Sequence, residues 1–309
     1  MSPAMRALRI GTRGSPLALA QAREVAGRLA QATGREVGDF PIEVIRVTGD
    51  AVQDRPLGQI GGKGLFTKEI EEALIAGRVD LAVHSMKDVP VEGPAGLALD
   101  CALPREDPRD AFVCLGDHAG LLDLPEGAVV GTSSLRRRAQ VLARRPDLRV
   151  VEFRGNVQTR LARLATGGAE ATFLARAGLN RLGLADVPAR AIPPDVMLPA
   201  LAQGVVGVQR REGDGEAAEL LALVHDAATG LRLAAERAFL KGLDGSCQTP
   251  IAGLAELEGD RVRLRGEILR PDGSEVLAED ATAPAEEGAE LGAVLACRLR
   301  RAAGSGFFL

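Results

Sequence analysis

Short apolar runs that alternate with helical patterns constrain the fold of this chain more than any other feature of its sequence. Residues 7–11, 42–48 and 79–83 are apolar runs, and helical patterns occupy residues 16–30 and 67–76 between them. Strands that alternate with helices in this way build α/β units around a largely parallel sheet. We therefore expect an α/β lobe in the first part of the chain.

The same alternation starts again after a proline-rich, charged connector at residues 104–109. The expected strands are 128–131, 149–153 and 171–175, and the expected helices are 134–145, 157–165 and 177–182. A second proline-rich stretch, residues 188–199, closes this block. Gly11-Thr12 and Gly131-Thr132 both stand between a strand and a helix. They fit either common turn chemistry or two similar lobes that each direct a helix N-terminus at an anion.

The last third of the chain has a different pattern. A long helix is expected at residues 227–243, and a terminal helix near 285–301. Between them, strands are separated by Gly259-Asp260 and by Pro271-Asp272-Gly273, which are typical hairpin turns. The sequence thus predicts α/β architecture with two doubly wound lobes and a small C-terminal α+β domain.

Composition excludes several classes of protein. The 309 residues carry a net charge of −4, with no Trp, no Tyr and eight Phe, which argues against nucleic-acid binding. No apolar run approaches the roughly 20 residues of a membrane helix, and the first residues lack a signal-peptide core. We expect a cytoplasmic protein. Four widely spaced Cys and three His indicate neither a disulfide framework nor a metal site.

Arginines follow the ends of several expected strands. In open α/β sheets, ligands bind beyond the carboxyl ends of strands, and an Arg fork matches carboxylate or phosphate geometry. The residues concerned, with two serines at a helix start, are Arg13, Ser133, Ser134, Arg136, Arg137, Arg154, Arg160, Arg176 and Arg181. They predict a polyanionic ligand, and a solvated basic face is the alternative interpretation.

Two further segments, both in the expected first lobe, carry residues that could take part in catalysis or binding. A strand ends at His84-Ser85-Met86-Lys87-Asp88, where the Asp88 carboxylate could stabilise a cation or move a proton. A role as a turn cap is the alternative for Asp88. Residues 61–66 form a glycine-rich loop with Lys63 and Phe66, and its spacing is not that of a phosphate-binding loop.

Cys247 lies in a Gly/Ser/Pro turn directly after the long helix. An accessible thiol there could be a nucleophile or a covalent attachment point, and an inert loop cysteine is the alternative. Cys101 and Cys114 lie in apolar runs and Cys297 lies on the terminal helix. We expect these three to be packing residues.

Taken in order along the chain, these motifs resemble the hydroxymethylbilane synthase, or porphobilinogen deaminase, family. The matching segments are residues 11–18, 61–66, 83–90, 131–137, 154–157, 177–179, 198–204 and 245–248. The resemblance implies a three-domain transferase of tetrapyrrole and haem biosynthesis. Such an enzyme condenses four porphobilinogen molecules head to tail, releases four ammonia molecules and yields linear hydroxymethylbilane.

The resemblance also implies roles for individual residues. Asp88 would be the catalytic carboxylate, and Cys247 would hold a covalent dipyrromethane cofactor through a thioether, with no metal. The other residues implied at the cofactor are Lys87, Ser133, Ser134, Arg136, Arg137 and Arg154. Those implied at the substrate are Arg13, Ser15, Lys63, Phe66, Arg160, Arg181 and Gln203. Gln59 stands where the family often has a second Lys.

The resemblance further implies two lobes similar to those of periplasmic binding proteins, with a cleft. The expected domains are 1–104 with 204–224, then 105–203, then 225–309. We expect a monomer that binds porphobilinogen and neither nucleic acid nor membrane. The alternative from another class is a two-lobed solute-binding module. Cys247→Ser separates the two, because only the synthase would lose a covalent primer.

Overall fold

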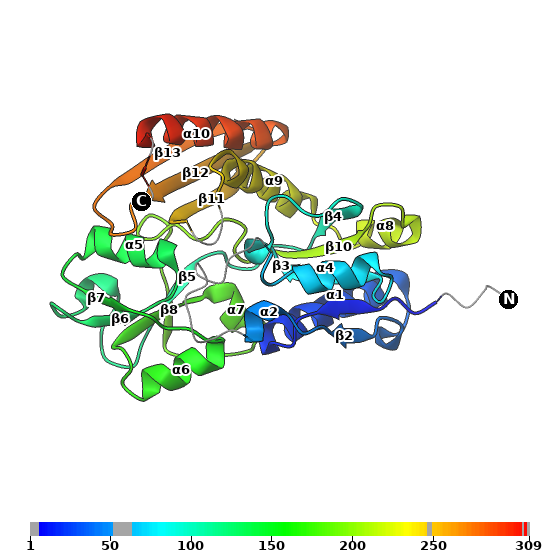
Figure 1. Cartoon of the computed structure of the whole chain (residues 1–309), viewed down its shortest axis with the longest axis horizontal. Coiled ribbons are helices and arrows are strands. Elements are labelled where there is room, and N and C mark those ends of the chain that lie inside the picture. The colour runs from blue at the N-terminus through cyan, green and yellow to red at the C-terminus, as the bar shows by residue number, and fades with distance from the viewer. Residues whose placement is uncertain (1–5, 52–63, 246–248, 305, 308–309) are drawn as a thin grey trace. The chain divides into compact units, whose positions relative to one another are not determined.

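The computed structural model describes residues 6–51, 64–245, 249–304 and 306–307. The chain separates into two compact units (Figure 1). Among the described residues, unit 1 comprises 6–51, 64–105 and 205–230, and unit 2 comprises 106–204, 231–245, 249–304 and 306–307. No helix among the described residues combines the length and hydropathy that crossing a membrane requires.

Unit 1 contains a five-stranded sheet in the order β2-β1-β3-β10-β4. The strands are β1 (Ile10–Thr12), β2 (Ile42–Val44), β3 (Leu81–Ser85), β4 (Leu97–Ala102) and β10 (Val206–Arg211). Strands β2 and β3 flank β1 in parallel, whereas β10 runs antiparallel to both β3 and β4. The sheet therefore includes one reversed strand that comes from much later in the chain.

Helices cover both faces of this sheet. Helix α1 (Pro16–Thr33) packs Val25 and Leu29 against Ile10 and Leu81, together with α8 (Gly215–Ala222), whereas α4 (Lys68–Ile75) covers the other face. Ser15 caps α1, since its hydroxyl accepts a hydrogen bond from the Ala18 backbone N–H at 3.2 Å. Shorter helical segments are α2 (Thr48–Ala51), η1 (Val37–Asp39) and η2 (Met86–Asp88).

Unit 2 repeats this topology in a second sheet, in the order β7-β6-β8-β5-β9. The strands are β5 (Asp110–Cys114), β6 (Val129–Gly131), β7 (Arg149–Val151), β8 (Ala171–Ala175) and β9 (Ala189–Ala191), and the helical segments are η3 (Leu121–Asp123), α5 (Leu135–Arg144), α6 (Val157–Ala165) and α7 (Arg176–Arg181). Strand β6, like β1 in unit 1, has two parallel neighbours, and β5 is the reversed strand. This equivalence favours two similar lobes over common turn chemistry.

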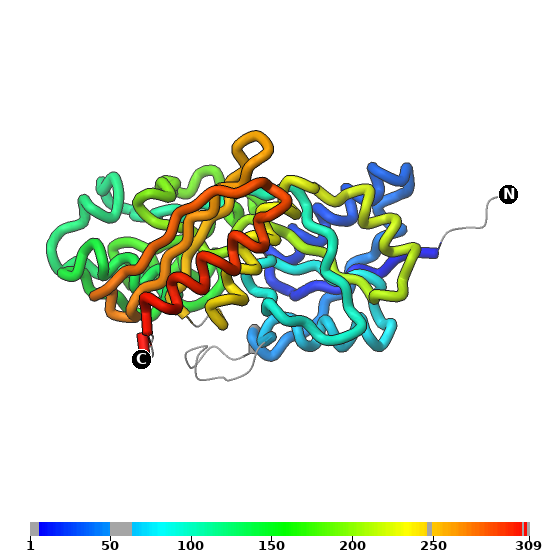
Figure 2. Tube along the Cα trace, turned by 90° about the horizontal axis from the view of Figure 1, so that it is seen from above, coloured from blue at the N-terminus to red at the C-terminus, as the bar shows by residue number. Residues whose placement is uncertain are grey.

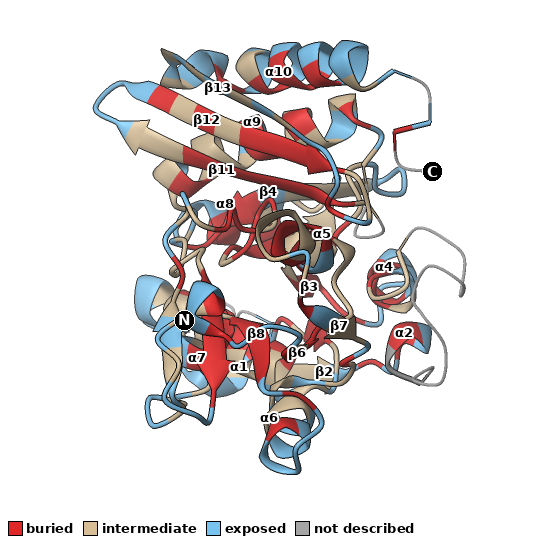
Figure 3. Ribbon diagram, turned by 90° about the vertical axis from the view of Figure 1, so that its left-hand side faces the viewer, coloured by how far each residue is buried: buried red, intermediate tan, exposed pale blue. Residues whose placement is uncertain are grey.

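The rest of unit 2 is a three-stranded antiparallel sheet with two helices on one face. Its elements are α9 (Ala227–Gly242), β11 (Ile251–Glu258), β12 (Arg261–Leu269), β13 (Val276–Pro284), η4 (Ala285–Glu287) and α10 (Gly288–Ala303). Figure 2 shows α10 running along the three strands, and Figure 3 shows the buried positions on β11, β12 and the inner side of α10. Phe239 of α9 packs so closely on β12 that a Cβ at Gly266 would lie 2.3 Å from its Cζ.

The expected fold class, two doubly wound α/β lobes plus a small α+β domain, is confirmed. Both lobes have helices on both faces of a mixed sheet. One expectation about packing is wrong: Cys297 is exposed on α10, whereas Cys101 and Cys114 are buried. The division into three domains stays a prediction.

Candidate active site

In unit 1, strand β3 ends in the turn that carries Lys87 and Asp88. Three contacts hold this end of the strand. Ser85 Oγ and the side-chain amide of Gln21 on α1 are hydrogen-bonded at 2.8 and 3.0 Å. Met86 is buried and packs against Gly207 of β10. The turn is therefore fixed by neighbours on two elements, while the Lys87 and Asp88 side chains remain half-buried.

Two residues predicted for the substrate lie beside Asp88. Arg13 Nη1 is 3.8 Å from Asp88 Oδ2, and the Arg13 guanidinium lies 4.2 Å from the centre of the Phe66 ring. The Asp88 side chain keeps 32% of its surface exposed. A guanidinium, an aromatic face and a reachable carboxylate thus converge, a combination suited to a ligand with both carboxylate and aromatic character.

The side chains of His84, Gln209 and Glu71 form a buried series of hydrogen bonds next to this turn. The sequence analysis did not predict this series. His84 Nε2 is 3.2 Å from Gln209 Oε1, and Gln209 Nε2 donates to Glu71 Oε1 at 3.4 Å. Burial lowers the pKa of His84 to about 4, against the opposing effect of the Gln209 hydrogen bond. Burial also raises the pKa of Glu71. His84 is therefore neutral at pH 7 and serves as a hydrogen-bond donor rather than a cation.

In unit 2, Arg136 and Arg137 meet at one fully buried carboxylate. Arg136 Nη1 donates to Asp110 Oδ2 at 2.7 Å, and Arg137 Nη2 donates to Asp110 Oδ1 at 2.7 Å. Gln203 Nε2 adds a third hydrogen bond, to Asp110 Oδ1 at 3.0 Å. Burial would raise the pKa of Asp110, but its attraction to the two arginines lowers that pKa well below the usual range.

Asp110 is thus a central residue that the sequence analysis did not single out. A lone Asp at the start of an apolar run could have been recognised, because a buried carboxylate requires charged partners. The structure brings three predicted residues, Arg136, Arg137 and Gln203, to it.

The other predicted residues of unit 2 lie just before helices, as Ser133, Ser134 and Arg154 do, or within them, as Arg160 does in α6 and Arg181 at the end of α7. Ser134 caps α5 and accepts from the Arg137 backbone N–H at 3.4 Å, and Ser133 Oγ accepts from the Phe153 N–H at 2.9 Å. Arg160 Nε donates to the Gly155 carbonyl at 2.9 Å, and Arg181 Nη1 donates to the Gly204 carbonyl at 3.1 Å. Arg154 is half-buried between β7 and α6.

Three positions named above, Gln59, Lys63 and Cys247, lie outside the described residues. The described residues can still be tested against a dipyrromethane, which presents carboxylates. Arg136 is 5% exposed, and its buried Nε has no hydrogen-bond partner among the described residues. A buried N–H that lacks an acceptor fits a bound anionic group. No cluster of His, Cys, Asp and Glu suited to a metal occurs in the described part of the chain.

Comparison with known proteins identifies the family. The family model of the porphobilinogen deaminase, dipyromethane cofactor binding domain matches residues 8–219, and that of the porphobilinogen deaminase C-terminal domain matches residues 231–301. The chain belongs to the porphobilinogen deaminase family. It is 63% identical to the porphobilinogen deaminase of Paracoccus denitrificans over 97% of this chain and 96% of the relative. It is 53% identical to the porphobilinogen deaminase of Nitrobacter winogradskyi, over 97% of this chain and 94% of that relative.

Membership of the porphobilinogen deaminase family confirms several expectations. The chain has the hydroxymethylbilane synthase function, a transferase activity of tetrapyrrole biosynthesis, and uses a dipyrromethane cofactor. Among solved structures, the periplasmic VFT2 domain of Bordetella pertussis BvgS is similar, with a TM-score of 0.42 and 15% identity over 70% of this chain and 86% of that one.

Proposed function

We propose that Asp88 is the catalytic carboxylate of the head-to-tail condensation of four porphobilinogen molecules. The observation that carries this proposal is the pairing of Asp88 with Arg13 at the end of β3, next to the Phe66 ring. A partly exposed carboxylate can accept hydrogen bonds from pyrrole N–H groups. It can thereby stabilise the positive charge that develops when the substrate loses ammonia, and accept the proton that is released later.

Arginines, Lys87 and Ser hydroxyls hold the carboxylates in this proposal. Each porphobilinogen brings two carboxylates, so the growing chain becomes densely anionic. Arg13 serves the substrate in unit 1, and in unit 2 Arg160 and Arg181 lie at helix positions suited to the same task. The dipyrromethane, when bound through Cys247, supplies a tethered primer, so each addition is effectively intramolecular.

We also propose that the enzyme is a cytoplasmic monomer with three domains. The large apolar side chains that are exposed among the described residues lie on separate elements, for example Val37, Ile75, Leu223 and Val294. Scattered apolar residues of this kind are normal on a monomer. The net charge of −4 supports the absence of nucleic-acid partners.

The part of the proposal that concerns Cys247 is tested by the intact mass of the purified protein, followed by mapping of the peptide that contains Cys247. We expect an added mass of two pyrrole units on that peptide, and production of hydroxymethylbilane from porphobilinogen. Cys247→Ser should lose both. Cys297→Ser is the matched control, because Cys297 is an exposed thiol on α10 and should change neither.

An unmodified wild-type thiol that stays unmodified after incubation with porphobilinogen would contradict the proposal.

A further inference from the structure

All the hydrogen bonds that the Arg136 side chain makes with the described residues come from one nitrogen of its guanidinium, Nη1. Its Nη1 donates to Asp110 Oδ2 at 2.7 Å, to Gln140 Oε1 at 2.9 Å and to the Leu198 carbonyl at 2.9 Å. Its Nε is buried and has no partner among the described residues. Asp110 therefore anchors Nη1 of the guanidinium, and the Nε–H donor lies at another edge of the same group.

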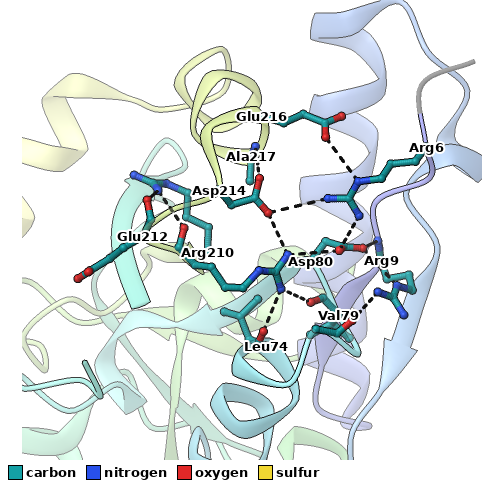
Figure 4. Close-up of polar contacts among 12 residues, drawn as sticks. Arg6, Arg9, Leu74, Val79, Asp80, Arg210, Glu212, Asp214, Glu216 and Ala217 are labelled. Carbon is teal, nitrogen blue, oxygen red and sulfur yellow. Dashed lines mark hydrogen bonds and ion pairs between the residues drawn. The ribbon is translucent and has the colours of Figure 1, made fainter. Parts of the chain in front are cut away.

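A second buried Asp shows how an Asp–Arg cluster is completed when its role is structural. Asp80, with 2% of its side chain exposed, lies among Arg6, Arg9 and Arg211 in unit 1. Figure 4 shows Asp80 with Arg6 and Arg9. Other donors of these arginines meet backbone carbonyls or carboxylates, as when Arg211 Nη1 donates to the Leu74 and Val79 carbonyls at 2.9 and 2.8 Å. No buried nitrogen of these three arginines lacks a partner among the described residues.

Three other arginines, Arg35, Arg210 and Arg265, also have one buried nitrogen for which the described residues provide no hydrogen-bond partner. Each of these pairs with a carboxylate at the surface, where 43 to 87% of the acidic side chain is exposed. Asp110, in contrast, is fully buried. The cluster around Asp110 thus combines a buried anchor with an unused donor.

A series of hydrogen bonds that begins at Glu236 on α9 helps to hold Asp110 in position. Glu236 is fully buried and accepts hydrogen bonds from the backbone N–H groups of Ala202, at 2.5 Å, and Ala255, at 2.8 Å. Ala202 adopts the left-handed conformation, with φ of 60°, directly before Gln203. Gln203 then donates to the Pro108 carbonyl at 2.8 Å and to Asp110 at 3.0 Å. A left-handed Ala is strained, and the hydrogen bond from the Ala202 N–H to Glu236 helps to hold the chain in this conformation.

We propose that Asp110 is a positioning residue that directs the Nε edge of Arg136 to a carboxylate of the bound dipyrromethane or of the growing chain, with Glu236 and Gln203 holding Asp110 in place. This inference rests on the proposed function, because it takes a tetrapyrrole precursor as the anionic ligand. Mispositioning Arg136 would misplace the terminal pyrrole that attacks, which affects the chemical step more than substrate binding.

The experiment compares Asp110→Asn and Arg136→Lys with wild type. Intact mass gives the share of molecules that carry the cofactor, and kcat and KM for porphobilinogen are expressed per loaded molecule. We expect a smaller loaded share, and a kcat at least about tenfold lower with KM changed less than about twofold, as loss of a charged hydrogen bond would produce. Lys keeps a charge beside Asp110 but has no Nε–H, so Arg136→Lys decides the question if Asp110→Asn does not fold.

Asp80→Asn is the matched control, since it removes a buried Asp that also holds arginines. It should lower the thermal unfolding temperature and leave the loaded share and kcat per loaded molecule unchanged. If the wild type is loaded and active while both test variants match it in loaded share and kcat, the positioning role of Asp110 is wrong and the proposed function stands. If the wild type neither carries nor acquires pyrrole mass, the proposed function is wrong and this inference falls with it.

Discussion

At the residue scale, Gly207 and Met86 share a space that admits no further atom. A Cβ on Gly207 would lie 2.1 Å from Met86 Sδ and 2.9 Å from Met86 Cγ. Met86 is 1% exposed, so its side chain cannot move aside into solvent. Because Lys87 and Asp88 follow directly, the missing methyl group at Gly207 helps to set the position of the proposed catalytic carboxylate.

Gly207→Ala should therefore impair both stability and activity. Overpacking of this kind typically destabilises a protein by about 1–3 kcal/mol. We expect a lower urea midpoint and a reduced kcat, because the turn that carries Asp88 must shift. Gly213→Ala is the control, since a Cβ there meets no atom within 4 Å. Wild-type kcat in Gly207→Ala would show that the turn absorbs the methyl group without moving Asp88.

Single residues also show where sequence reasoning reached its limit. Ser15 and Ser134 were predictable as helix caps, because capping depends on residues three apart in the chain. Asp110 was not, because its partners Arg136, Arg137 and Gln203 are 26 to 93 positions away. Cys297 was placed wrongly because an apolar helix pattern does not by itself state which face a residue occupies.

At the scale of elements, β3 joins three others through polar side chains. Ser85 contacts α1, and His84 contacts Gln209 of β10, which in turn contacts Glu71 of α4. Since Nε2 of the neutral His84 donates to the Gln209 oxygen, the Gln209 amide is oriented with its N–H groups toward Glu71. Each group in this series donates a hydrogen bond to the next, from His84 to Gln209 and from Gln209 to Glu71. Protonation of His84 would add no hydrogen bond to the series.

His84 should make stability fall as the pH drops below about 6.5. The unfolded chain takes up a proton there at its ordinary pKa of 6.5, whereas the folded chain resists until about 4. Unfolding is therefore favoured by up to about 3 kcal/mol as the pH falls from 6.5 to 4. Urea unfolding between pH 8 and 4 should show a shallower dependence in His84→Gln. His118→Gln should match wild type, and equal slopes in all three proteins would refute the assignment.

Elements built from neighbouring residues were predicted best. Helix α6 and strand β8 have the expected bounds, 157–165 and 171–175, because periodicity and turn residues are local signals. The reversed strands were not expected in a largely parallel sheet. Strand β10 pairs with β3 and β4 more than 100 residues earlier, and no local pattern records such a partner.

At the scale of the whole molecule, each compact unit contains one buried Asp surrounded by arginines. Burial would raise the pKa of Asp80, but hydrogen bonds from Arg6 and from the backbone and side chain of Arg9 lower it to about 2. Asp80 links the chain before β1 to the start of β3 and to the end of β10. Protonation of one carboxylate would therefore weaken the attachment of three segments of unit 1.

Asp80 should protect the enzyme against acid. Its stabilising contribution, roughly 2 kcal/mol from the lowered pKa, is present above the unfolded value of 3.8 and is lost as the pH falls toward 2. Asp80→Asn should be less stable than wild type at pH 7 and should approach it near pH 2, as measured by urea unfolding across this range. Asp100→Asn, at an exposed ion pair with Arg210, should stay close to wild type throughout. A constant difference between Asp80→Asn and wild type at every pH would argue against the ionised form as the source of this stability.

The late strand β10 also governs the order in which the chain can acquire its structure on the ribosome. The five strands of the second lobe are contiguous between residues 110 and 191, so their sheet can close as soon as they emerge. The first lobe must wait for residues 206–211, because β10 separates β3 from β4. The segment translated first is thus the one that completes its sheet second, and until then the nascent chain exposes the hydrogen-bonding edge of β3, the strand that leads to Asp88.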